Sequence, residues 1–101
     1  GTHDMFLEVN KQTRLCVAIA FNDIEPKQPI HVLVVPREHH ANIAELSFAN
    51  TEALVDLIQL GSKVAEELST GSFRLQFNTG AAAGQSVFHV HGHVMSATPK
   101  V

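Results

Sequence analysis

Three histidines stand at alternate positions of an apolar run near the end of the sequence. Residues 85–95 read Gln-Ser-Val-Phe-His-Val-His-Gly-His-Val-Met, which places His89, His91 and His93 two residues apart. A β-strand turns successive side chains to opposite faces, so this spacing predicts three imidazoles on one face and small or apolar residues on the other. Neighbouring imidazoles would stand about 6.5–7 Å apart along such a strand. The pattern therefore predicts a strand with one face for chemistry and one for packing.

The length and the residue usage indicate one globular domain. The chain of 101 residues is 45% hydrophobic and 17% charged, which is typical of a protein with a packed core rather than of a disordered chain. We expect a single domain over residues 1–101, in which residues 1–3 resemble a scar left by tag removal.

The charge balance and the cysteine count argue against several classes of partner and site. The net charge of −3 gives no electrostatic footprint for nucleic acid. Cys16 is the only cysteine, so neither an internal disulfide nor a cysteine-based zinc site can form within this chain. No apolar run approaches the ~20 residues that a membrane helix needs, and no signal peptide is evident. We expect a cytoplasmic protein with no nucleic-acid and no membrane partner.

Hydrophobic periodicity predicts four further strands and one long helix. The helix is expected over residues 50–69, with Asn50 as its N-cap and Gly71 just beyond its end. Residues 37–48 are expected to form an irregular connection. Strands are expected at residues 5–9, 14–21, 30–35 and 73–77. Because strands and helix are segregated, the expected fold class is α+β: an antiparallel sheet of about five strands, one long helix and room for a short one.

Four groups of residues together resemble the histidine triad superfamily. They are the triad itself, residues 30–37 followed by His39, the run Phe21-Asn22-Asp23-Ile24, and Asn78 ahead of Gly84-Gln85-Ser86. The resemblance covers residues 21–94 and implies the α+β fold of that family, in a homodimer. The Gly-Gln-Ser lead-in is similar to that of the nucleotide-binding, Hint-like phosphoramidases. The dinucleotide hydrolases of the superfamily usually carry threonine where Ser86 stands.

The resemblance implies a catalytic set centred on the triad. By its position, His91 resembles the nucleophile that takes up a nucleoside monophosphoryl group, and His89 resembles the residue that orients it. His93 and Ser86 are similar to ligands of the phosphate and the leaving group, and His39 to the histidine that extends the network behind His89. The implied activity is hydrolysis or transfer of nucleoside 5′-monophosphate phosphoramidates or esters, with adenylates as the expected substrates.

The resemblance also implies contacts to the nucleotide. Asp23 is similar to the acceptor of the ribose hydroxyls, and Ile24 to a wall of the base pocket. Asn78 and Gln85 are similar to phosphate or ribose contacts. A glycine at position 84 lets the backbone approach a phosphate closely. Ser86, His91 and His93 also belong to the residues expected to contact the nucleotide.

Imidazole suits this chemistry for reasons that do not depend on the family. Its unperturbed pKa of about 6.5 leaves most of it neutral at pH 7 and able to attack phosphorus. One specific nitrogen must be free, so the other should donate a hydrogen bond, for which a backbone carbonyl is the expected acceptor. Crowding of imidazoles should discourage their protonation, so activity should survive to mildly acidic pH. The mechanism requires no cofactor and no metal.

Other readings of the same residues stay open. The triad could bind a transition metal, since histidine is the commonest ligand, and the chain could bind a nucleotide without catalysis or act on dinucleoside polyphosphates. Asp23 could simply favour a turn. We expect His31 to lie on the strand face away from the core with no role, and His40 to lie on the surface.

Two glycines stand out in the predicted elements. Gly61 weakens the interior of the helix by about 1 kcal/mol relative to alanine, unless another element approaches it closely. Gly92 stands where related proteins normally carry a bulky apolar residue, so the space behind the triad must be filled by another residue or left loosely packed.

Overall fold

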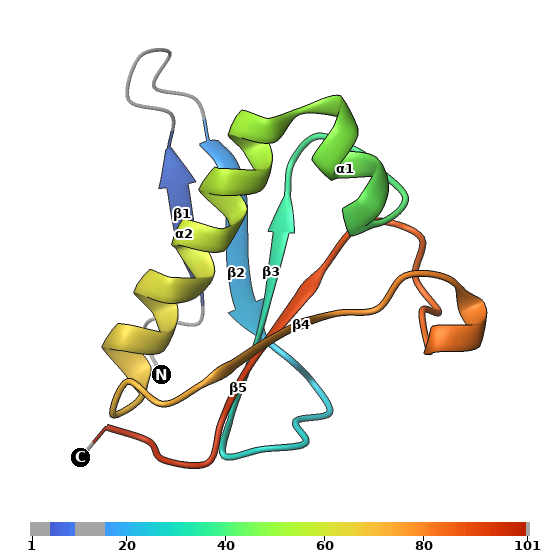
Figure 1. The fold of residues 1–101 in the computed structure, drawn as a ribbon. Helices are drawn as coiled ribbons and strands as arrows, with labels where there is room; N and C mark the ends of the chain where they lie inside the picture. The colour runs from blue at the N-terminus through green and yellow to red at the C-terminus, as the bar shows by residue number, and fades with distance from the viewer. Residues whose placement is uncertain (1–4, 10–15, 101) are drawn as a thin grey trace.

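The computed structural model confirms the α+β fold. It describes residues 5–9 and 16–100; residues 1–3 and the first two residues of the strand expected at 14–21 lie outside this part. Five antiparallel strands form one sheet in the order β1-β2-β3-β5-β4 (Figure 1). The strands are β1 (Met5–Val9), β2 (Cys16–Asn22), β3 (Ile30–Pro36), β4 (Arg74–Phe77) and β5 (Gly92–Ser96). The helices are α1 (Ile43–Ala49), α2 (Thr51–Leu68) and a 3-10 turn, η1 (Ala81–Ala83).

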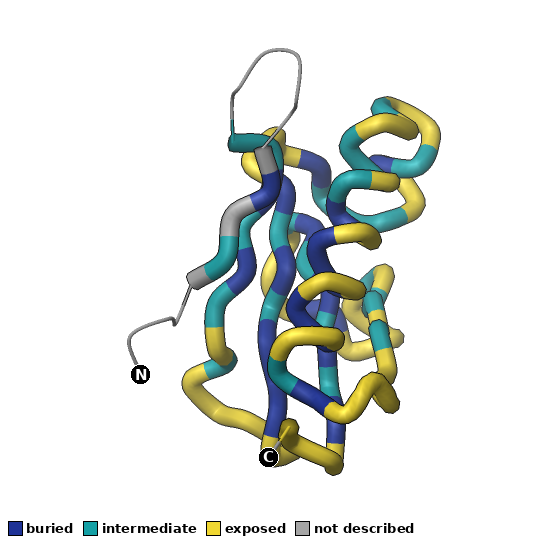
Figure 2. Tube along the Cα trace, turned by 90° about the vertical axis from the view of Figure 1, so that its left-hand side faces the viewer, coloured by how far each residue is buried: buried dark blue, intermediate teal, exposed yellow. Residues whose placement is uncertain are grey.

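Helices cover only one face of the sheet, as Figure 2 shows. Burial alternates along β2 and β3, so that one set of side chains packs under α2 and the other faces the open side. The packed set contains small and branched side chains, which allow the helix to lie close to the sheet. The hydrophobic core combines this set with residues of α2 and β5, and its main members are Ala18, Ala20, Val32, Val34, Leu57, Leu60, Val64 and Val94.

The long helix begins at the expected cap. The Asn50 side-chain oxygen accepts from the backbone N–H of Ala53, which satisfies one of the free donors at the start of α2. The helix ends at Leu68, with Ser69 as its C-cap, and Gly71 follows at a φ of 103°. The expectation of an irregular connection over residues 37–48 is wrong in part, because α1 begins at Ile43, capped by the Asn42 side chain.

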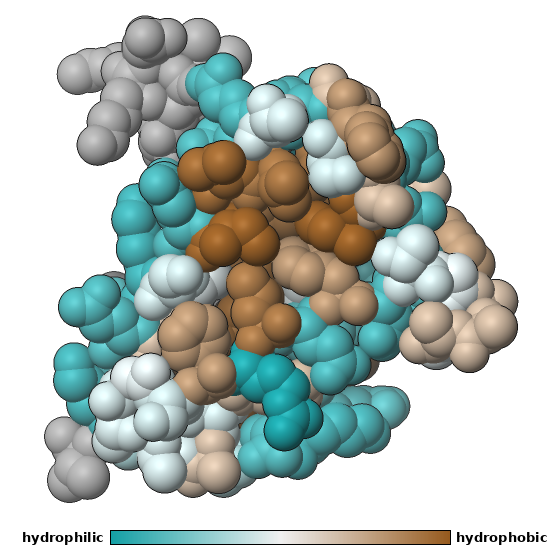
Figure 3. Space-filling model, viewed as in Figure 1, coloured by the Kyte–Doolittle hydropathy of each residue, from teal (hydrophilic) through white to brown (hydrophobic). Residues whose placement is uncertain are grey.

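Hydrophobic side chains also gather near the centre of the molecular face seen from the helix side (Figure 3). Two apolar residues of α2, Val55 and Ile58, are 51% and 37% exposed.

Within the described residues, no helix is long and apolar enough to cross a membrane.

The triad strand is shorter than its alternation predicts. β5 begins at Gly92, so His89 and His91 precede it. The register that pairs Val34 with Gly92 would set Pro36 opposite Val90, and a proline has no N–H for the ladder. Val90 instead donates its N–H to the carbonyl of His40, at 2.8 Å. The alternation of burial nevertheless continues, because Val90 and Val94 are 2% and 0% exposed.

Aromatic packing fills the space behind the triad that Gly92 leaves. A Cβ on this glycine would lie 2.7 Å from the Phe77 ring and 3.1 Å from Val34, so the ring occupies the place of a side chain. Gly61 of α2 lies against Val94 and Leu75, where a Cβ would make ordinary contacts of 3.4 and 3.6 Å. The space beside Gly61 would accept a methyl group, so no neighbouring element approaches so closely that glycine is required there.

Candidate active site

The candidate site lies on the open face of the sheet, where β2 and β3 run beside the triad segment. A hollow of about 160 Å³ is lined there by Phe21, Leu33, Val35, Val87, His89 and His91. The first three come from the side of β2 and β3 that faces away from α2. An apolar floor therefore lies directly beside two histidines of the triad.

The His91 ring is held by the backbone of its own segment. Its Nδ1 lies 2.9 Å from the carbonyl oxygen of His89. A carbonyl can only accept, so Nδ1 carries the proton and Nε2 keeps a free electron pair. The expected backbone acceptor is thus confirmed, and His89 provides it through its carbonyl rather than through its ring.

The His89 ring forms a second network. Its Nε2 donates to the carbonyl of Pro36 at 2.9 Å, and its Nδ1 lies 2.9 Å from Nδ1 of His39. Since the proton of a neutral His89 is on Nε2, the proton shared between the two Nδ1 atoms belongs to His39. The expected contact of His39 behind His89 is confirmed. These bonds fasten the triad segment to the end of β3.

His93 is the triad member that lies within β5. Its ring stands edge-on to that of His91, with 5.2 Å between the centroids, which is closer than the strand spacing predicts. Its Nδ1 lies 2.9 Å from Nε2 of His31. Partial burial lowers the pKa of His93, and the neighbouring His91 and His31 rings lower it further, whereas Asp23 opposes the shift.

Two histidines, one expected to have no role and one expected on the surface, are buried and hydrogen-bonded. His31 does lie on the face away from the core, but its side chain is only 3% exposed, and it contacts His93 and Asp23. His40 is 9% exposed, and its Nε2 lies 2.6 Å from the Glu38 carboxylate. The expectation of a surface position for His40 is therefore wrong. The turn after β2 and His93 of β5 contact the His31 ring, whereas the His40 ring contacts Glu38, two residues earlier.

Asp23 combines the turn role with a place at the site. One carboxylate oxygen accepts from the N–H of Glu25 at 2.8 Å, and the other lies 3.4 Å from His31 Nε2. Asp23, His31 and His93 each offer a ligand atom, and these atoms lie within 4.8 Å of one another, as a metal site requires. The neighbouring Ile24 is 94% exposed and does not line the hollow.

The loop ahead of the triad is braced by Gln85. This side chain is buried, and its amide nitrogen donates to the carbonyls of Ala41 and Val87 at 2.6 and 3.0 Å. Its oxygen accepts from the N–H of Gly80. The side chain predicted to contact a phosphate or ribose is thus bonded within its own loop and to the connection that follows β3.

Three other loop residues predicted to contact a nucleotide are placed differently. Gly84 has a φ of 96°, which favours glycine, and a Cβ on it would meet the Asn78 amide at 3.7 Å. The Asn78 oxygen accepts from Gln76. Ser86 is exposed. Their contacts to a nucleotide stay predictions.

Sequence reasoning missed the apolar floor of the hollow. Phe21, Leu33 and Val35 were assigned to strands without regard to which face they occupy. The signal was present, because Leu33 and Val35 alternate with the buried Val32 and Val34. Two apolar faces on one strand predict that something besides the helix covers the second.

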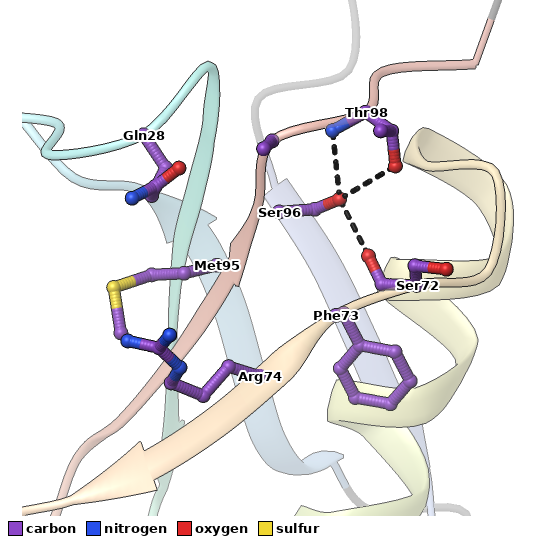
Figure 4. Close-up of a pocket in the computed structure, with 8 residues that line it drawn as sticks. Gln28, Ser72, Phe73, Arg74, Met95, Ser96 and Thr98 are labelled. Carbon is purple, nitrogen blue, oxygen red and sulfur yellow. Dashed lines mark hydrogen bonds between the residues drawn. The ribbon is translucent and has the colours of Figure 1, made fainter.

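A larger hollow lies elsewhere, between the start of β4 and the end of β5. Its volume is about 380 Å³, and Arg74 and Met95 lie along its wall (Figure 4). The Ser96 hydroxyl donates to the carbonyl of Ser72 at 2.6 Å and lies 3.3 Å from the Thr98 hydroxyl. These polar groups bond to one another, and no triad histidine lines this hollow, so it is not the candidate active site.

Comparison with known proteins identifies the family. The model of the HIT domain matches residues 10–100. The chain is 33% identical to a purine nucleoside phosphoramidase of Escherichia coli over 82 residues, which are 79% of this chain and 69% of that protein. It is 34% identical to an uncharacterised HIT-like protein of Synechocystis, over 82% of this chain and 74% of that protein.

Solved structures agree with this assignment. A HIT family hydrolase from Clostridium thermocellum is 43% identical, with a TM-score of 0.73 over 79% of this chain and 71% of that one. One from Legionella pneumophila is 33% identical, with a TM-score of 0.75 over 92% of this chain and 80% of that one. The chain therefore belongs to the histidine triad (HIT) family.

Proposed function

We propose that this protein is a nucleoside phosphoramidase that works through a covalent nucleotidyl-His91 intermediate. The observation that carries the proposal is the 2.9 Å contact between His91 Nδ1 and the carbonyl of His89. This contact commits one ring nitrogen as a donor and leaves Nε2 as a nucleophile. The similarity to a phosphoramidase of Escherichia coli supports the same reaction class.

In the first step, the Nε2 electron pair of His91 attacks the phosphorus of a nucleoside 5′-phosphoramidate. A bond forms between Nε2 and phosphorus, and the bond from phosphorus to the leaving amine breaks. The departing nitrogen keeps the electron pair and takes a proton, which we assign to the Ser86 hydroxyl or a neighbouring imidazole. N–H groups around the phosphate stabilise its charge, and His93 is the ring placed beside His91 to supply one.

In the second step, water attacks the same phosphorus from the opposite side. The bond to His91 breaks, the imidazole recovers its electron pair, and the proton of water restores the group that protonated the amine. The product is a nucleoside monophosphate. Imidazole serves both steps because it is a good nucleophile when neutral and a good leaving group when attached to phosphorus. This proposal requires no metal and no cofactor.

The expected substrate is a purine nucleotide that resembles AMP. The apolar hollow of Phe21, Leu33 and Val35 offers a surface for a planar base beside His91. Asp23 offers a carboxylate for the ribose hydroxyls, as the family resemblance implies. We assign phosphate contacts to Ser86, His93 and the backbone near Gly84.

We also propose a cytoplasmic homodimer. β4 forms one edge of the sheet, and Val55 and Ile58 are exposed on the helix that crosses the sheet. An edge strand and exposed apolar side chains together favour association with a second copy. Light scattering should give the mass of two chains, whereas the mass of one chain would overturn the dimer.

The test of the function is release of AMP from adenosine 5′-phosphoramidate, followed by chromatography. We expect hydrolysis by the native chain and a loss of at least about 1,000-fold in His91→Ala, since no other group replaces the nucleophile. Release by both proteins would contradict the role of His91. AMP binding without release would indicate a nucleotide-binding protein, and faster cleavage of diadenosine polyphosphates would indicate a dinucleotide hydrolase.

A further inference from the structure

His31 is a buried imidazole that the two steps above do not use. Its side chain is 3% exposed. Three polar groups surround the ring: the backbone nitrogen of Lys27 is 2.9 Å from Nδ1, and His93 Nδ1 and an Asp23 oxygen are 2.9 and 3.4 Å from Nε2. Because buried ring nitrogens are almost always hydrogen-bonded, these neighbours determine where the His31 proton lies.

The Lys27 backbone decides which His31 nitrogen carries the proton. A backbone N–H can only donate, so Nδ1 of His31 accepts and carries no proton. The proton of the neutral ring is therefore on Nε2. Nε2 faces two acceptors, of which His93 Nδ1 is the closer. His31 thus donates to His93.

We propose that His31 is a positioning residue that holds His93 in the tautomer with its proton on Nε2. Since His93 Nδ1 accepts from His31, the single proton of the neutral His93 ring must be on its other nitrogen. That nitrogen then presents an N–H, rather than a lone pair, to a phosphoryl oxygen. The catalytic consequence rests on the proposed function, whereas the tautomer does not.

The two triad rings would then have complementary states. His91 presents a free electron pair at Nε2, and His93, whose ring centroid is 5.2 Å away, presents an N–H. An attacking nitrogen and a donor to the phosphoryl oxygens are both required by attack on phosphorus. With the opposite tautomer, His93 would turn a second lone pair toward the charged oxygens and repel them.

The same proton assignment argues against a metal at Asp23, His31 and His93. A metal on His31 Nε2 would require the proton to move to Nδ1, where it would face the N–H of Lys27. Metal-bound histidines instead donate their second N–H to an acceptor. The three side chains are close enough for an ion, but the turn after β2 places the Lys27 N–H, a donor, beside His31 Nδ1, where a metal-bound histidine needs an acceptor.

Two substitutions of His31 separate its two hydrogen bonds. In His31→Asn, the side-chain oxygen reaches the position of Nδ1 and can accept from Lys27, but no donor reaches His93. In His31→Gln, the amide nitrogen reaches the position of Nε2 and can donate to His93, while the bond to Lys27 is lost. The two variants are matched in chemistry, and circular dichroism checks that both are folded.

Nitrogen NMR of histidine-labelled protein reads the tautomer directly. We expect His93 in the native chain and in His31→Gln to show a protonated Nε2 and an unprotonated Nδ1 above pH 7. In His31→Asn the two tautomers should mix. A His93→Gln variant assigns the signals. A native His93 protonated on Nδ1, or a tautomer unchanged in His31→Asn, would overturn the proposal.

Hydrolysis of adenosine 5′-phosphoramidate gives the second readout. We expect kcat to fall roughly 10- to 100-fold in His31→Asn, as when the partner that orients a catalytic imidazole is removed, with little change in KM. His31→Gln should stay near the native kcat. Equal losses in both variants, or none in either, would overturn the catalytic role. If the native chain is inactive, the proposed function fails, and the NMR result still decides the tautomer.

Elemental analysis of the native chain completes the test. After incubation with zinc and dialysis, we expect the native chain to retain less than one equivalent of zinc per chain. Zinc retained by the native chain and lost in both His31 variants would overturn the assignment of the His31 proton.

Discussion

Each triad ring has a nitrogen committed to a neighbour, and that neighbour decides what the other nitrogen can do. The carbonyls of His89 and Pro36 fix the protons of His91 and His89, while another imidazole fixes that of His93. Three chemically identical side chains therefore take different roles. The sequence predicts a backbone acceptor for the nucleophile, because attack requires one. It does not predict the role of His31, whose contact with His93 spans 62 positions.

The lowered pKa of His93 predicts a pH dependence of stability. Below its ordinary pKa of 6.5, the unfolded chain binds a proton at this residue that the folded chain resists, mainly because the ring is partly buried. The unfolded state then binds more protons, so the free energy of unfolding rises with pH in this window. The contribution is fully present above pH 6.5 and is lost as the pH falls toward the folded-state pKa.

Urea unfolding of the native chain and His93→Asn measures this contribution. Between about pH 5 and 7, the native chain should lose more stability on acidification than the variant does. This range lies above the ordinary pKa values of the carboxyl groups. Glu38, whose pKa is lowered by its hydrogen bonds to His40 and Asn50, therefore stays ionised throughout and does not contribute to the difference. Parallel pH curves would contradict the shift. Because protonation of one imidazole discourages protonation of the next, activity should also persist into mildly acidic conditions, and a pH–rate profile that collapses near about pH 7.5 would count against this expectation.

At the scale of elements, the alternation of buried side chains in the triad segment extends further than the hydrogen-bond ladder of β5 does. The alternation of burial extends to Val90, but the ladder of β5 begins only at Gly92. Pro36 ends the neighbouring strand and removes the donor that would continue the pairing. The proline was visible in the sequence, but its position opposite Val90 depends on the register of β3 against β5. The face on which each histidine lies was therefore predictable, whereas the residue at which β5 begins was not.

The packing of Phe77 onto Gly92 predicts a destabilising substitution. In Gly92→Ala, the added methyl group would meet the Phe77 ring at 2.7 Å, so β4 or the ring must move. Overpacking of this kind costs about 1–3 kcal/mol of unfolding free energy. Urea unfolding measures the loss, and Phe77→Leu in the same chain should recover part of it.

Gly61→Ala is the matched control in α2. Its methyl group would make ordinary contacts with Val94 and Leu75, and alanine favours a helix over glycine by about 1 kcal/mol. We expect this variant to be as stable as the native chain or more so. A Gly92→Ala variant as stable as Gly61→Ala would show that the Phe77 ring does not fill the space behind the triad.

At the scale of the molecule, the sheet collects the site from segments that are distant in sequence. The turn after β2 supplies Asp23 and Lys27, β3 supplies His31, and the segment before β5 supplies His91. The fold class could be predicted, because periodicity and segregation of elements are local properties. The buried environment of His31 could not be predicted, because Lys27 and His93 contact that ring only when the turn after β2 and strand β5 are in place. The burial of His40 was not predicted either. The family resemblance proposed residues for the reaction, and the structure adds the hydrogen-bond partners that place protons on their rings.

A covalent nucleotidyl-His91 intermediate would leave a stereochemical signature at phosphorus. Each in-line displacement at phosphorus inverts its configuration, so two successive displacements restore it, whereas direct attack by water inverts it once. The measurement is the stereochemical course of hydrolysis of a chiral adenosine 5′-phosphorothioate amide in oxygen-18 water. Net retention is the predicted result, with no turnover by His91→Ala. Net inversion would contradict the nucleotidyl-His91 intermediate.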